Sequence, residues 1–431
     1  MRILFVSNLY PPNSVGGYEK LAFSVASELS RRGHEICVLT SDHGDAIADY
    51  PGQRVFRELT LLTGETIYEP FAGDEEASAR LRERNDNRLR DTVAREKPDL
   101  VFSWNLFFLH PSMLATLESL PVPVAVMLTD NWLINMVKPQ WWQSYFAAEV
   151  MGGGSAAPPR GSSPSFVSRV RARLRNIRAK EAHPRANAAG PARRSLTAIF
   201  GSHYMHDLHR QAGLTFAREE TIHNGVKSLG TPTHSGPDRG LLVDPEGSVR
   251  LLFAGRLVDL KGAHRAVEAL GILRRTRPDL PPITLTILGD QQDRSYERTL
   301  AAAVEASGCS EQITMRPPVR ENELRAVFAE HDIYLFPSLY EPFSLTLIHA
   351  LGEGIPTIAS DAGGNGEIVV HGRTGLTYPR GDSQALADRI ATLVEDSALR
   401  ARLGAAGRVA AARFTFTTMV DSMERLLEDM R

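Results

Sequence analysis

Short apolar runs alternate with amphipathic segments along the whole of this 431-residue chain. The pattern begins at Ile3–Val6 and begins again at Arg250–Phe253, each time as an apolar strand followed by a loop and a helical pattern. Strands that alternate with helices indicate βαβ units, whose parallel sheets are covered by helices on both faces. The sequence therefore predicts an α/β protein of two doubly wound, Rossmann-like domains.

The remaining elements follow the same periodicity. Tyr18–Arg31 has apolar residues at helical spacing and predicts the first helix. The other expected strands are Glu35–Leu39, Leu100–Phe102, Val122–Leu128, Ala198–Phe200, Thr284–Leu288, Ile313–Met315, Ile333–Phe336 and Thr357–Ala359.

Length and local composition give the expected domain boundaries. A chain of 431 residues exceeds one ordinary core. Residues 1–225 are expected to form one domain, with a basic insertion at about 151–194. Residues 226–248 are rich in Gly, Pro, Ser and Asp and read as a linker. Residues 249–410 form the second domain, and a helix within 411–431 crosses back to the first.

Bulk composition excludes several classes of protein. With 42% hydrophobic and 23% charged residues and a net charge of −2, the chain gives no indication of nucleic-acid binding. Cys37 and Cys309 are too few for a disulfide framework, and Cys37 lies in an apolar run that predicts burial. Ile3–Val6 is too short for a signal peptide, and no apolar stretch is long enough to span a bilayer. We expect a cytoplasmic protein.

One segment breaks the rhythm. Residues 160–194 hold ten Lys and Arg against the single acid Glu181, and apolar residues recur among them at helical spacing. A basic amphipathic helix can lie on an anionic membrane surface, which would place the protein peripherally at the inner face of the membrane. A helix packed on its own domain explains the pattern too, and we favour that interpretation. An aromatic cluster just upstream fits core packing or an acceptor- or lipid-facing surface; its members are Trp132, Trp141, Trp142, Tyr145 and Phe146.

Two motifs in the second half carry chemistry. In the first motif, Gly255 and Gly262 enclose Arg256 and Lys261 in a loop that follows the apolar strand. In the second, Glu341 lies 80 residues after Lys261. Pro342 suits the first turn of a helix, whose free N–H groups near Ser344–Thr346 would face an anion. Two cations and a helix N-terminus suit a diphosphate, and a carboxylate suits a sugar hydroxyl. The alternative is a surface turn with two solvated cations.

A glycine pair in the first half occupies the equivalent place. Gly16 and Gly17 come after the first strand and open the first helix, at the edge of a doubly wound sheet where ligands bind. Glycines let a backbone approach a ligand closely, although they also serve as plain turn residues.

These motifs resemble the retaining GT-B glycosyltransferases of the GT4 family, also described as glycosyl transferases group 1. The resemblance covers nearly the whole chain apart from about residues 135–195. It is carried by Gly16-Gly17-x-Glu19, Asn224-Gly225-Val226, Gly255-Arg256-Leu257-x-x-x-Lys261-Gly262, Pro337-Ser338-x-x-Glu341-Pro342-Phe343, Gly354-x-Pro356, Ser360-Asp361-x-Gly363-Gly364-x-x-Glu367-Ile368-Val369, His371-Gly372-x-Thr374-Gly375 and Phe414-Thr415-Phe416.

The resemblance implies two domains facing across a deep cleft, with a nucleotide-diphospho-sugar on the second and the acceptor on the first. It implies transfer to an acceptor hydroxyl with retention, without a metal ion or other cofactor, because Arg256 and Lys261 neutralise the leaving diphosphate while Glu341 holds the sugar. The acceptor is a small molecule, a glycan or a lipid-linked sugar. Glu19, Asp130 and Asn131 are the acceptor-side candidates. The implied donor-binding residues are Gly16, Gly17, Gly255, Arg316, Ser338, Phe343, Ser344, Leu345, Thr346 and His349.

Three positions depart from the family pattern. His349 stands where a second glutamate usually binds the ribose, and an imidazole cannot chelate a diol as a carboxylate does. Thr129 replaces a histidine before Asp130. Arg316-Pro317-Pro318 fills a loop near the base where a glycine is common. Two alternatives therefore stay open: a GT-B enzyme that epimerises or hydrolyses nucleotide-sugars without a sugar acceptor, and a catalytically degenerate sugar-nucleotide-binding partner.

One histidine cluster has the spacing of a metal-binding helix face. His203, His206 and His209 lie three residues apart, but no cysteine or carboxylate pattern accompanies them. We interpret them as residues of a surface or interface helix and expect no metal site.

Overall fold

The computed structural model describes residues 1–44, 50–64, 66–67, 69–151, 193–227, 247–290, 294–320 and 323–431. The chain divides into two compact units. The first holds the described residues within Met1–Phe146, Arg171–His223 and Thr417–Arg431, and the second those within Ala147–Val170 and Asn224–Phe416. Each unit contains one parallel sheet, so the predicted α/β class is confirmed.

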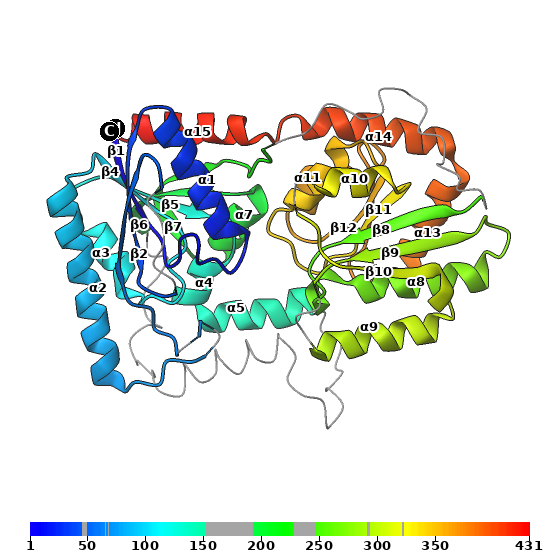
Figure 1. The fold of residues 1–431 in the computed structure, drawn as a ribbon, viewed down its shortest axis with the longest axis horizontal. Helices are drawn as coiled ribbons and strands as arrows, with labels where there is room; N and C mark the ends of the chain where they lie inside the picture. The colour runs from blue at the N-terminus through cyan, green and yellow to red at the C-terminus, as the bar shows by residue number, and fades with distance from the viewer. Residues whose placement is uncertain are drawn as a thin grey trace. The chain divides into compact units, whose positions relative to one another are not determined.

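The first unit is built on a seven-stranded sheet in the order β3-β2-β1-β4-β5-β6-β7. Figure 1 shows α1 on one side of this sheet and α2 with α3 on the other. The strands are β1 Arg2–Val6, β2 Glu35–Ser41, β3 Gln53–Leu59, β4 Leu100–Ser103, β5 Val124–Leu128, β6 Arg193–Phe200 and β7 Thr215–Thr221. The helices are α1 Gly17–Arg31, α2 Glu75–Glu96, α3 Ser112–Glu118, α4 Trp132–Val137, α5 Pro139–Tyr145, α7 His203–Gln211 and α15 Phe416–Asp429. The π-helix Phe146–Val150 follows α5, and its residues from Ala147 onward belong to the second unit.

The second unit repeats the plan with a six-stranded sheet in the order β10-β9-β8-β11-β12-β13. Its strands are β8 Val249–Ala254, β9 Ile283–Leu288, β10 Ile313–Arg316, β11 Ile333–Phe336, β12 Thr357–Ser360 and β13 Leu376–Tyr378. Its helices are the 3₁₀-helices Asp259–Lys261 and Ser310–Gln312, α8 Ala263–Thr276, α9 Arg294–Ser307, α10 Leu324–Ala329, α11 Leu345–Gly352, α12 Asn365–Ile368, α13 Ser383–Glu395 and α14 Ser397–Ala411.

The second sheet is buried on both faces. Leu251 and Phe253 of β8 belong to one hydrophobic cluster, and Leu252 and Ala254 belong to another. Successive side chains of a strand point to opposite faces, so β8 contributes to a core on each side of the sheet. This double burial explains why the central strands read as continuous apolar runs.

The C-terminal helix α15 packs within the first unit. Its Glu424 accepts hydrogen bonds from Arg32 at 2.6 Å and from Nε2 of His34 at 2.7 Å, and Asp421 pairs with Arg32 at 2.7 Å. Arg32 lies only 17% exposed among these carboxylates. Ion pairs of this degree of burial fix geometry more firmly than exposed pairs do. They hold α15 against the C-terminal end of α1.

Some expected features lie outside the described residues. The basic segment 160–194 is described only from residue 193, where β6 begins, and Arg194 pairs with Glu118 at 3.3 Å. Most of the linker 226–248 is also outside. None of the helices in the described ranges combines the length and apolar character needed to cross a bilayer.

Candidate active site

The loop after β8 is joined closely to the neighbouring strand end. The Gly255 N–H donates to the Leu288 carbonyl at 3.0 Å, and the Leu257 N–H donates to Asp290 at 3.2 Å. A Cβ atom on Gly289 would lie 2.1 Å from the Gly255 carbonyl oxygen, so only glycine allows this approach. The tight loop leaves Arg256 exposed at the carboxyl edge of the sheet, and its guanidinium has no ion-pair partner among the described residues.

Lys261 is brought to Glu341 across 80 residues of sequence. Its ammonium forms an ion pair with the Glu341 carboxylate and lies 5.7 Å from the centre of the Phe336 ring. Glu341 is only 7% exposed and Lys261 is half-buried. Sequence reasoning gave these two residues separate tasks, whereas the structure shows them in direct contact at one edge of the second sheet.

Backbone bonds hold the two motifs in register. The Leu260 carbonyl accepts from the Leu339 N–H at 2.8 Å and from the Ser338 hydroxyl at 3.1 Å. Gly262 has φ of +71°, and a Cβ there would lie 2.2 Å from the Pro337 carbonyl oxygen. The turn after Lys261 therefore requires glycine twice over, for its backbone conformation and for the close approach. Ser338, predicted as a donor-binding residue, stabilises the loop instead of presenting its hydroxyl to solvent.

The helix after Glu341 begins later than expected. Ser344 caps α11 by accepting from the Leu347 N–H at 3.2 Å, and α11 starts at Leu345. Pro342 and Phe343 therefore precede the helix, and the prediction that Pro342 lies in its first turn is wrong. A serine cap gives a better start than a proline here because its side chain satisfies a helix N–H. The N–H groups of Leu345 and Thr346 stay at the open end of α11.

The N-terminus of α8 is closed, in contrast to that of α11. The Tyr296 hydroxyl accepts from the His264 N–H at 3.1 Å and contacts His264 Nδ1 at 3.0 Å. Burial raises the pKa of Tyr296 and lowers that of His264, so both are neutral at physiological pH. Because a side chain from α9 already occupies this helix end, α11 is the better of the two for binding an anion.

Two other predicted donor-binding residues lie on regular elements of the second unit. His349 is half-buried on α11, one turn beyond the helix start. Arg316 ends β10 and forms an ion pair with Glu330 at 2.6 Å. The sequence pattern did not indicate Glu330 as its partner.

In the first unit, Gly16 and Gly17 open α1. The Gly16 N–H donates to the Glu19 carboxylate at 3.0 Å, so Glu19 closes the helix start and is only 4% exposed. Apart from its chain neighbours, no atom of the described residues lies within 4 Å of a Cβ placed on either glycine. Packing within this unit thus leaves the surface over the glycine pair open, whereas the Glu19 carboxylate is already engaged by the backbone.

Asp130 and Asn131 lie between β5 and α4 in the same unit. Asp130 accepts from the Trp132 N–H at 2.8 Å. Burial raises the pKa of Asp130 to about 6, and the Glu19 carboxylate adds to this rise. The Asp130 side chain is half-buried and therefore contacts both protein and solvent. It can hold a proton at a pH where most aspartates cannot.

An aromatic group that no sequence motif indicated supports this corner. The Tyr18 hydroxyl donates to the Met127 carbonyl and accepts from the Trp132 indole at 3.2 Å. Its ring meets Trp104 edge to face at 5.6 Å. Burial raises the pKa of Tyr18 well above its ordinary value. Tyr18 ties the start of α1 to the end of β5 and so positions the glycine pair.

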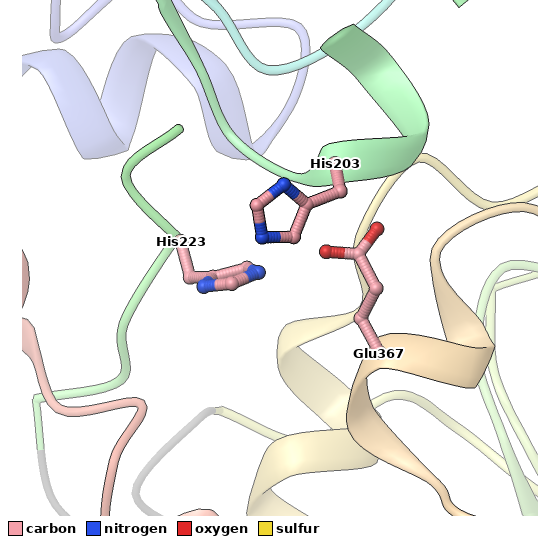
Figure 2. Close-up of side chains that lie close together, drawn as sticks. All are labelled: His203, His223 and Glu367. Atoms are coloured by element: carbon pink, nitrogen blue, oxygen red, sulfur yellow. The ribbon is translucent and has the colours of Figure 1, made fainter. Parts of the chain in front are cut away.

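The three clustered histidines have different environments. His209 is fully buried, its Nδ1 donates to the Met205 carbonyl at 2.7 Å, and burial lowers its pKa to about 4. His206 pairs with Glu219 at 2.9 Å. Figure 2 shows His203 beside His223, their rings edge to face at 5.3 Å, and also draws Glu367 of the second unit. The predicted surface position is wrong for His209, because its ring packs against the core.

Comparison with known proteins finds a glycosyltransferase family for each of the two parts of the chain. Residues 239–410 match the family described as glycosyl transferases group 1, and residues 15–228 match glycosyltransferase family 4. The chain belongs to the group 1 glycosyltransferase family. The GT4-type resemblance found in the sequence is thereby confirmed.

The similar proteins of known name have different activities in their names. A D-inositol 3-phosphate glycosyltransferase of Pseudarthrobacter chlorophenolicus is 37% identical over 39% of this chain and 40% of its own length. The chain thus spans about two fifths of that relative. A glycogen synthase of Mycobacterium tuberculosis is 26% identical over 95% of this chain and 89% of its own length.

Solved structures give the fold. Sucrose-phosphate synthase from Thermosynechococcus elongatus is 20% identical, with a TM-score of 0.68 over 100% of this chain and 98% of its own. Anabaena HepE, solved with UDP and glucose, is 20% identical, with a TM-score of 0.62 over 100% of both chains. These likenesses confirm the predicted GT-B architecture of two Rossmann-like domains.

Proposed function

We propose that this group 1 glycosyltransferase transfers a sugar from a nucleotide-diphospho-sugar to an acceptor hydroxyl, with retention of configuration and without a metal ion. The observation that carries the proposal is the Lys261–Glu341 ion pair after β11, with Arg256 exposed in the loop after the neighbouring strand β8. An exposed guanidinium, a half-buried ammonium and a carboxylate match a diphosphate joined to a sugar.

The positive charges of Arg256 and Lys261 suggest how these residues would act. As the bond between the anomeric carbon and the phosphate oxygen breaks, negative charge grows on the leaving diphosphate. Arg256 and Lys261 would stabilise that charge more strongly in the transition state than in the ground state. Open N–H groups at the start of α11 would add partial positive charge. Two fixed cations supply what a divalent metal supplies to a diphosphate elsewhere.

Glu341 would have two tasks in turn. Before binding, its carboxylate holds the Lys261 ammonium in place. With donor bound, the same carboxylate would accept hydrogen bonds from the sugar hydroxyls, while Lys261 turns to the phosphate. The acceptor hydroxyl would form the new glycosidic bond on the face that the phosphate leaves, and the departing phosphate would take up its proton. Family membership supports this retaining course.

We also propose a division of labour between the units. The second unit would bind the donor, and the first would bind the acceptor near Asp130 and Asn131, while Gly16 and Gly17 stay candidates for contact with the donor. Because the neighbour Anabaena HepE was solved with UDP and glucose, UDP-glucose is the first donor to try. His349 in place of a glutamate would leave one ribose hydroxyl with a weaker partner.

The test is release of nucleotide diphosphate from a panel of nucleotide-sugars, with and without EDTA. We expect slow hydrolysis of one donor without acceptor and an unchanged rate in EDTA. With an acceptor that stimulates turnover, the anomeric coupling in the proton NMR spectrum of the product should match that of the donor. Loss of activity in EDTA refutes metal independence, and an inverted product refutes retention.

Other outcomes identify the alternatives. An epimerised donor indicates a nucleotide-sugar-processing enzyme without a sugar acceptor. Donor binding without turnover of any kind indicates a degenerate sugar-nucleotide-binding protein. The departures from the family pattern at His349 and Thr129 suggest this alternative.

A further inference from the structure

Three aromatic rings form a stack on α5 of the first unit. Trp141 lies 5.1 Å from Tyr145, with ring planes 12° apart, and Trp142 lies 5.9 Å from Tyr145, with planes 25° apart. Trp142 is 6% exposed and serves the core, while Trp141 and Tyr145 are half-buried. We call the half-buried pair the aromatic shelf.

The shelf lies at the ligand-binding edge of the first sheet. β5 ends at Leu128, and α4 and α5 follow it directly. The Tyr145 hydroxyl hydrogen-bonds to the hydroxyl of Tyr204 at 3.1 Å, and Tyr204 is the second residue of α7, just after β6. Both connections therefore start from the carboxyl ends of parallel strands, where α/β proteins bind their ligands. This placement separates the shelf from an ordinary core cluster.

The shelf offers both parts of a sugar-binding surface. The flat faces of Trp and Tyr can pack on the C–H face of a pyranose ring, and their polar groups can bond its hydroxyls. Trp141 makes its ring contact with Tyr145, and within the described residues its indole N–H has no hydrogen-bond partner. The hydroxyls of Tyr145 and Tyr204, which are hydrogen-bonded to each other, are the second polar group of the shelf.

A lipid surface fits the same rings less well. Aromatic side chains that anchor a protein to a bilayer stand out into the interface and are accompanied by cations. Here both shelf rings are half-buried, their hydroxyl end is tied to α7, and Lys138 is the only cation in the stretch from α4 to α5. A pyranose ring is the better match.

We infer that the outer face of Trp141, supported from behind by the stacked ring of Tyr145, forms a stacking subsite for a pyranose ring of the acceptor. This inference rests on the proposed function and deepens it, because it makes the acceptor a glycan or glycoside.

Saturation-transfer difference NMR on the full-length protein tests the subsite without turnover. The probes are methyl α-glucopyranoside, methyl α-mannopyranoside, methyl β-galactopyranoside, N-acetylglucosamine and maltose at millimolar concentration. We expect at least one probe to receive saturation on its ring protons. Trp141→Ala should reduce that signal at least fivefold. Gln140→Ala, an exposed position on the same helix, is the matched control and should keep it.

Kinetics separate failure of the subsite from failure of the proposed function. Using the probe that binds as acceptor, Trp141→Ala should raise its KM about tenfold, the size of one stacking contact. Acceptor-free donor hydrolysis should stay at the parental rate. An unchanged acceptor KM, or no probe bound by the parent, overturns the subsite while the transferase stands. Co-sedimentation of the parent with vesicles of phosphatidylcholine and phosphatidylglycerol gives the lipid comparison. Loss of that binding on Trp141→Ala, without loss of the sugar signal, overturns the subsite in favour of lipid. Absence of donor turnover in the parent counts against the transferase itself.

Discussion

The two sheets present the same kind of loop with opposite chemistry. After β1, Gly16 and Gly17 open a helix with the carboxylates Glu19 and Asp130 nearby, and the one cation bonded to this loop among the described residues, Arg57, donates to the Tyr10 and Pro11 carbonyls further from the helix start. After β8, the loop is packed tightly through Gly262 and carries the cations Arg256 and Lys261. One scaffold thus offers an uncrowded acidic edge and a rigid basic edge. A transferase needs both, since the donor is an anion and the acceptor is an alcohol.

The largest expected effect comes from removing the basic edge. Lys261→Ala or Arg256→Ala should each lower kcat/KM by about 10²–10³, because each removes a preorganised charge from the leaving diphosphate. Steady-state release of nucleotide diphosphate measures this. Arg320→Ala, which removes an exposed arginine of the same unit that pairs with Glu323, is the control and should change the rate less than twofold.

The double variant Arg256→Ala/Lys261→Ala makes the comparison stricter. If it binds and turns over every donor as the parent does, the basic edge is not the donor site. The contrast between the two loops would then have no functional meaning.

The rigidity of the basic loop gives the next effect. In Gly262→Ala the new methyl would meet the Pro337 carbonyl oxygen at a backbone angle that only glycine adopts readily. We expect a loss of about 2–3 kcal/mol in the free energy of unfolding, from strain and displacement together. Urea denaturation measures it. Gly366→Ala, where a Cβ meets no atom within 4 Å, is the matched control. Equal stability of the two variants would show that the loop tolerates movement.

Sequence reasoning identified the central strands of both sheets and the edge strand β10, and it missed the other three edge strands. The three strands it did not predict are β3, β7 and β13, each at the margin of its sheet. Gln53–Leu59 and Thr215–Thr221 carry charged residues at solvent-facing positions, and Leu376–Tyr378 is very short. An edge strand is covered on fewer sides, so it lacks the continuous apolar run that reveals a central strand.

The candidate site shows the same division. Arg256, Lys261 and Glu341 were predicted because charge and glycine spacing are visible in sequence. The direct pairing of Lys261 with Glu341 was not, because it depends on the Leu260 carbonyl joining two loops that are 80 residues apart. Tyr18 and Tyr296 were missed for a similar reason: each hydroxyl acts on a backbone group of another element, and no local pattern records that.

A smaller effect tests the acidic edge. Because the pKa of Asp130 is raised to about 6 from an ordinary 3.8, its contribution to stability is full below pH 4 and is lost as pH rises through 6. Asp130→Asn should therefore be more stable than the parent at pH 8 by about 1–2 kcal/mol, after allowance for partial exposure, and equal to it near pH 4. Thermal unfolding across pH 4–8 measures this. Asp91→Asn, on an exposed position of α2, should leave the curve unchanged. A parent and variant that respond alike to pH would refute a desolvated Asp130.

The smallest effect on stability comes from the open glycines, and it separates packing from ligand approach. Since no atom lies within 4 Å of a Cβ on Gly17, Gly17→Ala should change the free energy of unfolding by less than about 0.5 kcal/mol. If a ligand approaches this backbone, the same methyl should still raise a substrate KM severalfold. Urea denaturation and steady-state kinetics of the same variant measure the two effects. Gly213→Ala is the control, because Gly213 also has free space around a Cβ but has a positive φ, so its stability loss shows the effect of backbone strain alone. An unchanged KM would mean that substrates do not approach the glycine pair, and the two loops would then differ in function as well as in charge.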